Sequence, residues 1–123
     1  MLPLQHERKS QDREDAITLT PEFKALVKTR VERDPGFRDA LLKEAIDSML
    51  SGDVATGKAV LRDYINATIG FERLSKATGT PSKSLMRMFG PTGNPRSENL
   101  FNVIRLLQKQ AHLKLRVETK GER

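Results

Sequence analysis

Residues 71–89 read FERLSKATGTPSKSLMRMF, and this stretch decides the fold. An apolar-patterned segment ends at Gly79, and a second segment begins at once with Thr80 and Pro81. Gly79 permits the positive φ of a sharp turn, Thr80 is predicted to cap the second helix, and Pro81 pre-sets its first φ. The pattern predicts two short helices joined by a tight turn. Proteins use this arrangement to place one helix in the major groove of DNA.

Helical spacing divides the second of these helices, about residues 81–89, into two faces. Leu85 and Met88 are expected to pack on the first helix. The opposite face and its border carry residues suited to base edges: Ser82, Lys83, Ser84, Met86 and Arg87. Lys and Arg donate to guanine, Ser donates or accepts, and Met touches the thymine methyl group. Arg87 is the best candidate for bidentate guanine recognition; phosphate contact or plain solvation is the alternative, above all for Lys83.

The next segment, residues 90–97, is a loop rich in Gly and Pro. Asn94, Arg96 and Ser97, with the free amides at the start of the following helix, suit contacts to phosphate groups. Ser97 is predicted to cap that helix. The alternative is an interhelical loop without a ligand.

Capping residues divide the rest of the chain into helices. Thr20, Asp34 and Asp53 each precede a helical apolar stripe, and the three helices predicted lie within residues 20–33, 34–50 and 53–68. Residues 113–117, LKLRV, alternate apolar and polar side chains and are interpreted as a short strand, or else as a frayed helix end. Such a strand would pair with its copy in a second chain and make a dimer.

Three segments follow from these patterns. Residues 1–18 mix charges without apolar periodicity and are predicted to be a flexible tail. Residues 19–52 form an N-terminal helical extension. Residues 53–123 form the helix-turn-helix DNA-binding domain with its C-terminal strand.

The charge of the chain is unevenly placed. The net charge of its 123 residues is +6, and residues 68–123 hold 11 Lys and Arg against 4 Asp and Glu. A basic C-terminal half indicates a polyanionic partner, the alternative being a basic surface without a ligand.

Composition excludes several kinds of chemistry. The chain has no Cys, and its two His residues, His6 and His112, lie far apart. With no Gly-rich phosphate loop and no nucleophile–base set, we expect no enzyme, no cofactor and no metal. No apolar run approaches the ~20 residues that span a membrane. We therefore expect a cytoplasmic protein without membrane contact, associated with the nucleoid when bound to DNA.

Three quoted segments carry a family resemblance: LRDYINATIGFE at residues 61–72, TGTPSKSLMRM at 78–88 and GPTGNP at 90–95. Together they resemble the bacterial addiction-module antidote regulators, which are Cro/lambda-repressor-class (XRE-like) helix-turn-helix transcriptional regulators. The resemblance covers about residues 37–117 and implies an all-α fold with a five-helix DNA-binding domain. The chain departs from the family in two ways: Phe71, expected to be a core residue, stands where many of these domains place a phosphate-contacting Gln, and the N-terminal helical extension, residues 20–50, is not part of the minimal domain. Within the motif itself, Thr78 stands where an aliphatic residue is common.

The function implied by the resemblance is sequence-specific transcriptional regulation. It implies a homodimer that binds a palindromic operator in double-stranded DNA and represses its own toxin–antitoxin-like operon. It also implies a RelE-like toxin as partner. The alternative is a protein-binding antidote whose main role is to mask that toxin, with the amphipathic helices of residues 20–50 packed on it. The remaining alternative is a helical scaffold that binds no DNA.

Overall fold

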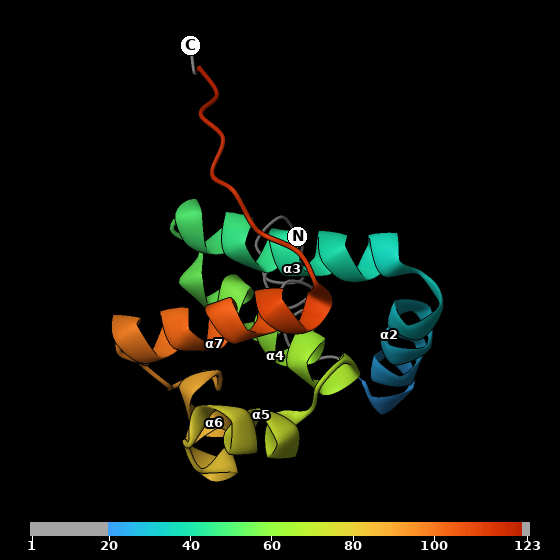
Figure 1. Ribbon diagram of the computed structural model, residues 1–123, viewed down its shortest axis with the longest axis vertical. Coiled ribbons are helices and arrows are strands. Elements are labelled where there is room, and N and C mark those ends of the chain that lie inside the picture. The colour runs from blue at the N-terminus through green and yellow to red at the C-terminus, as the bar shows by residue number, and fades with distance from the viewer. Residues whose placement is uncertain (1–19, 122–123) are drawn as a thin grey trace, which may run out of the picture.

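A computed structural model of the chain describes residues 20–121, and the predicted tail, residues 1–18, lies outside them. The described part is all-helical, as predicted. Figure 1 shows α3 at one end of the molecule and α5 with α6 at the other, while α4 and α7 lie between them. The helices are α2 (Pro21–Arg33), α3 (Pro35–Leu50), α4 (Val54–Ala67), α5 (Phe71–Thr78), α6 (Ser82–Met88) and α7 (Ser97–Ala111).

The predicted caps of the first three helices are confirmed. The side chains of Thr20, Asp34 and Asp53 accept hydrogen bonds from the backbone N–H three residues later, at 3.1, 3.1 and 3.3 Å. Pro occupies the first turn of both α2 and α3, where its missing N–H costs nothing. Local chemistry therefore sets where these helices begin.

The predicted caps at Thr80 and Ser97 are wrong. α6 begins one residue later than a Thr80 cap requires, with Pro81 at the cap position, and α7 has Arg96 at its cap position. Neither cap position supplies a side-chain hydrogen bond. Thr80 does not cap α6 because its backbone groups are bonded to side chains of the preceding helix. Ser97 does not cap α7 because it is already the first residue of that helix.

The N-terminal helices share a core with the rest of the described chain. Leu42 and Ala45 of α3 are completely buried and belong to the main apolar cluster. α3 and α4 cross closely at Gly57, where an added Cβ would lie 2.9 Å from the carbonyl oxygen of Ala45. A helix of the predicted extension thus packs directly on the predicted DNA-binding part.

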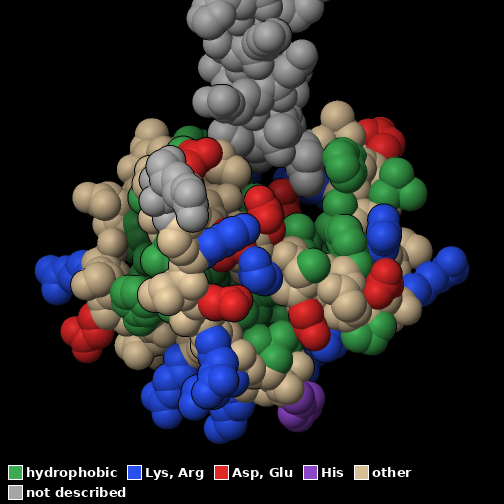
Figure 2. All heavy atoms as spheres, turned by 90° about the horizontal axis from the view of Figure 1, so that it is seen from above, with side chains coloured by type: hydrophobic (Ala, Val, Ile, Leu, Met, Phe, Trp, Pro, Cys, Tyr) green, Lys and Arg blue, Asp and Glu red, His purple; other side chains and the backbone are tan. Residues whose placement is uncertain are grey.

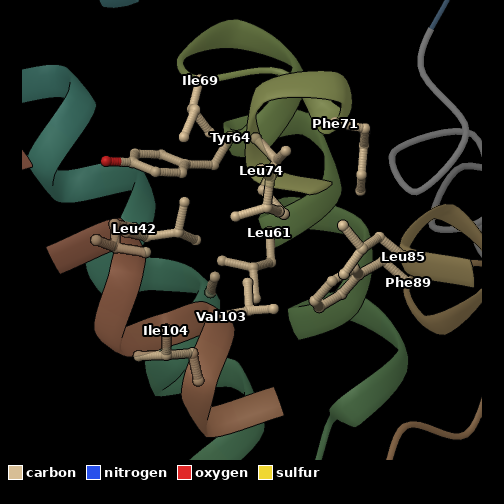
Figure 3. Close-up of a cluster of buried hydrophobic side chains, with 13 residues drawn as sticks. Leu42, Leu61, Tyr64, Ile69, Phe71, Leu74, Leu85, Phe89, Val103 and Ile104 are labelled. Carbon is tan, nitrogen blue, oxygen red and sulfur yellow. The ribbon is translucent and has the colours of Figure 1, made fainter. Parts of the chain in front are cut away.

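The same cluster anchors α5 and α6. Leu74 and Leu85 are buried, as expected, and the rings of Phe71 and Phe89 lie 6.4 Å apart with a tilted geometry. Figure 3 shows these side chains converging on Leu61 of α4. Phe71 is therefore a core residue, and the short helix pair is rigidly attached to the body of the molecule.

The structure does not confirm the predicted C-terminal strand. Residues 113–121 follow α7 as an irregular extended segment that runs past α3 (Figure 1). Its alternation is still visible in burial, because Leu113 and Leu115 pack partly on the core while Lys114 and Arg116 are exposed. A strand needs a neighbouring strand for its backbone hydrogen bonds, and in the described chain the N–H of Leu115 instead donates to the Gln108 side chain at 2.7 Å.

A bilayer-spanning helix is not present in the described part of the chain, since none of its helices combines the length and the hydropathy required.

Candidate nucleic-acid interface

The turn between α5 and α6 is closed by its own polar side chains. Gly79 adopts the left-handed conformation at φ 79°, and its N–H donates to the carbonyl oxygen of Ser75 at 2.8 Å. The Ser75 hydroxyl in turn donates to the carbonyl oxygen of Thr80 at 2.6 Å. These bonds fix the direction in which the chain leaves α5.

The hydrogen bonds of Thr78 explain why a polar residue stands where the helix-turn-helix motif often has an aliphatic one. Its hydroxyl donates to the carbonyl oxygen of Leu74 at 2.9 Å and accepts from the N–H of Thr80 at 3.3 Å. An aliphatic side chain would leave that N–H without this acceptor. Thr78 therefore replaces packing with hydrogen bonding at the turn.

The short helix α6 has one buried and one exposed face. Leu85 is only 1% exposed, whereas Met86 is 45% exposed although it is apolar. Lys83 and Arg87 are also exposed, on the same side as Met86, while Ser82 and Ser84 lie half-buried at the border. Lys83, Arg87 and Met86 therefore share the exposed face of α6. These side chains are long enough to reach base edges, and the two cations can donate hydrogen bonds to them.

A buried lysine secures the loop that follows α6. Lys58 of α4 is 7% exposed, and its ammonium group donates to the carbonyl oxygens of Gly90 and Gly93 at 3.2 and 2.5 Å. The N–H of Gly90 also donates to the carbonyl oxygen of Arg87 at 3.1 Å. The loop is therefore clamped to α4 and to the end of α6.

Gly93 makes this clamp sterically possible. A Cβ at this position would lie 1.9 Å from the Arg87 carbonyl oxygen and 2.7 Å from that of Met88. Beyond it, Asn94, Arg96 and Ser97 are all exposed. Because no side chain caps α7, its first-turn amides are available to an external acceptor.

The charge pattern of the described surface fits an anionic partner. None of the three ion pairs found among residues 20–121 includes Lys83, Arg87 or Arg96. Figure 2 shows Lys and Arg side chains gathered along one edge of the molecule. The described residues contain no group of three His, Asp or Glu side chains placed to hold a metal ion.

Sequence reasoning found the exposed side chains of this surface but missed Lys58. The signal was present, since Lys58 lies three residues before Leu61 on the apolar stripe of its helix. A cation on a buried stripe needs a buried acceptor. Its acceptors, however, are backbone carbonyls about 30 residues away, which helical periodicity alone does not locate.

Comparisons of this chain with protein-family models, with curated proteins and with solved structures find no match.

Proposed function

We propose that this protein is a sequence-specific DNA-binding transcriptional regulator built on a Cro-like helix-turn-helix domain, with α6 as its recognition helix. The observation that carries the proposal is the outward face of α6. Lys83, Met86 and Arg87 project there, while Leu85 on the opposite face is buried. A half-exposed Met beside two cations offers an apolar contact for thymine methyl groups.

In the proposed mechanism, one group of residues recognises the bases and a second group positions the protein on the phosphates. Arg87 reads guanine through its two-pronged guanidinium group, with Ser82, Lys83, Ser84 and Met86 contacting neighbouring bases or phosphates. Asn94, Arg96, Ser97 and the open amides of α7 hold phosphates, and Thr80, just before α6, is proposed as a further DNA contact. The Lys58 clamp keeps these two groups of residues in a constant relation.

A homodimer is the proposed active form. Two copies of α6 then enter successive major grooves of a palindromic operator, with half-sites about 34 Å apart. Residues 113–117, an extended segment with Leu113 and Leu115 partly buried, are the segment proposed to pair with its copy in the second protomer. We propose autorepression of a toxin–antitoxin-like operon, in the cytoplasm and on the nucleoid, as the biological role.

The test is binding of the full chain to the DNA just upstream of its own gene, against a scrambled duplex of equal length. The wild-type protein is expected to prefer the upstream DNA. Arg87→Ala should lose roughly 5- to 150-fold of that preference for each half-site, the value of one bidentate base contact. Arg87→Lys keeps the charge, so it should retain affinity for the scrambled duplex while losing preference.

The matched control is Arg33→Ala, which removes an exposed arginine from the end of α2, away from α6. This variant should bind both duplexes as the wild type does. Equal binding of both duplexes by the wild type, unaffected by Arg87→Ala, would refute sequence-specific recognition through α6.

A second candidate function is supported by α2. Phe23 and Leu26, on the apolar stripe of this helix, are 49% and 69% exposed, whereas Val31 further along the stripe is buried. An apolar helix face of this kind suits a protein partner, proposed here as a RelE-like toxin that the antidote masks. Co-purification with the neighbouring gene product, abolished by Phe23→Ser with Leu26→Ser, tests it; a complex unaffected by this pair would contradict it.

A further inference from the structure

A cavity of about 410 Å³ lies where the N-terminal helices meet the rest of the molecule. Its walls come from α2, α3, α4, α5 and α7, so of the six described helices only α6 contributes nothing. The volume falls in the ~300–1000 Å³ range of small-molecule sites. The cavity is distinct from the exposed face of α6 described above.

Tyr64 brings a polar group to this cavity from the core. The residue is 2% exposed, yet it lines the cavity, and Figure 3 shows its hydroxyl pointing out of the apolar cluster toward the ribbon of the N-terminal helices. Within residues 20–121 that hydroxyl makes no hydrogen bond. Burial raises the pKa of the Tyr64 phenol, so the hydroxyl remains a donor at neutral pH.

The charged residues around the cavity are predominantly basic. Lys28, Arg38 and Arg73 come from three different helices and face a single acid, Glu32. Arg38 pairs with Asp39 at 3.2 Å, but no ion pair within the described chain includes Lys28 or Arg73. Cations gathered from separate helices around one phenol donor form a site for a negative charge.

The remaining wall is mostly apolar, with the polar residues Thr68 and Gln110 beside the apolar ones. Val31, Ile69 and Leu107 line the cavity and belong to the buried part of the molecule. A free inorganic ion would leave this surface uncovered, whereas an organic molecule would cover it.

We propose that this cavity binds a small organic anion, with a carboxylate or phosphate group held by Arg38, Arg73 and the Tyr64 hydroxyl, and an aliphatic body against the apolar wall. Such a ligand joins α2 and α3 to α5. Its binding therefore stabilises the attachment of the N-terminal helices to the helix pair, in proportion to ligand concentration. The proposal goes beyond DNA binding and does not depend on it.

The chain carries its own reporter for this site, because Tyr64 is its single Tyr and it has no Trp. The full chain is titrated with 4-methylpentanoate and, separately, with 3-methylbutyl phosphate, at constant ionic strength set by chloride. Neither anion absorbs where tyrosine does. Saturable change in tyrosine emission with a rise in melting temperature is expected for at least one anion, and the tighter of the two identifies the head group.

Two variants and one control decide whether the response comes from this cavity. Arg38→Met and Arg73→Met each remove a charged donor of the site, so each should weaken binding roughly 10-fold or more. Arg105→Met removes an exposed arginine of α7 that does not line the cavity, and should leave binding within about 2-fold. Tyr64→Phe, followed by melting temperature, should lose most of the ligand-induced rise.

The proposal is overturned if neither anion gives a saturable response beyond that of chloride. It is equally overturned if Arg73→Met, whose exposed position leaves folding intact, binds as the wild type does. Because no DNA enters any of these titrations, their outcome is separate from that of the recognition experiment.

Discussion

Lys58 is the single side chain on which the position of the loop after α6 most depends. Lys58→Met keeps a long unbranched side chain but removes the donor to the carbonyl oxygens of Gly90 and Gly93. The Gly93 carbonyl then loses this partner, while the Gly90 carbonyl keeps only the N–H of Gly93 at 3.1 Å, and the free energy of unfolding should fall by about 1–3 kcal/mol. Chemical denaturation of both proteins measures the difference.

The matched control is Lys76→Met, which replaces an exposed lysine on α5. Its effect should stay below about 0.5 kcal/mol. Equal effects of the two substitutions would mean that the Lys58 clamp contributes nothing to stability.

The burial of a second residue, Asp63, predicts that the stability of the fold depends on pH. One of its carboxylate oxygens is buried without a hydrogen bond among the described residues, and burial raises the pKa of Asp63 above 3.8, against the opposing charges of Arg62 and Lys24. Between 3.8 and the raised native pKa, only the folded state holds the proton, so this group makes stability fall as pH rises.

Asp63→Asn should therefore stabilise the protein at neutral pH, and the gain should shrink as the pH falls toward about 4. Denaturation curves of the two proteins across this interval give the difference. A gain that stays constant with pH would show that the titration of Asp63 does not contribute.

At the scale of the element, sequence predicted helices well and their boundaries unevenly. Thr20, Asp34 and Asp53 act locally, so their capping could be foreseen. Thr80 could not, because its backbone groups are taken by side chains of the preceding helix.

The C-terminal segment shows that a local sequence pattern does not by itself determine whether a strand forms. The alternation in residues 113–117 agrees with burial only in part, because Leu113 and Leu115 are partly buried but Val117 is 77% exposed. It does not supply a partner for the backbone, and strand formation depends on that partner. The exposed side chains of α6 followed from helical period alone, whereas the Lys58 clamp required the tertiary fold.

The crossing of α3 and α4 offers a prediction for packing. Gly57→Ala gains about 1 kcal/mol of helix propensity but places a Cβ 2.9 Å from the backbone oxygen of Ala45 and 2.4 Å from Met49 Cγ. The Met49 side chain has room to turn aside, but the backbone does not. We expect a net loss of about 1–2 kcal/mol in the free energy of unfolding.

Gly36→Ala is the comparison for this packing prediction, because its Cβ would meet only the Asp34 side chain, at 3.3 Å. Its effect on the denaturation midpoint should be small or stabilising. A stabilising Gly57→Ala would show that the two helices separate easily, and that their close approach is not a constraint.

At the scale of the whole molecule, the uneven charge predicts how DNA affinity responds to salt. If Lys83 and Arg96 of both protomers contact phosphates while Arg87 reads guanine, four counterions are displaced, and log affinity should fall against log salt with a slope of about −4. Arg96→Ala removes two of those contacts and should make the slope shallower by about 2, without changing sequence preference.

Titrations of the upstream and scrambled duplexes over a series of salt concentrations measure both quantities. Arg33→Ala again serves as control and should keep the wild-type slope. A wild-type slope near zero would contradict the electrostatic part of the proposed mechanism, whatever the sequence preference.

The burial of Lys58 also has a chemical consequence. Amine-acylating reagents reach only a lysine in contact with solvent, and Lys58 is shielded from solvent while its side chain holds the two loop carbonyls. Its acylation in the intact chain therefore waits for the loop to detach, as amide exchange waits for local opening. Peptide mass spectrometry of that one amine would time the opening, and a bound duplex that holds the loop in place would slow the reaction.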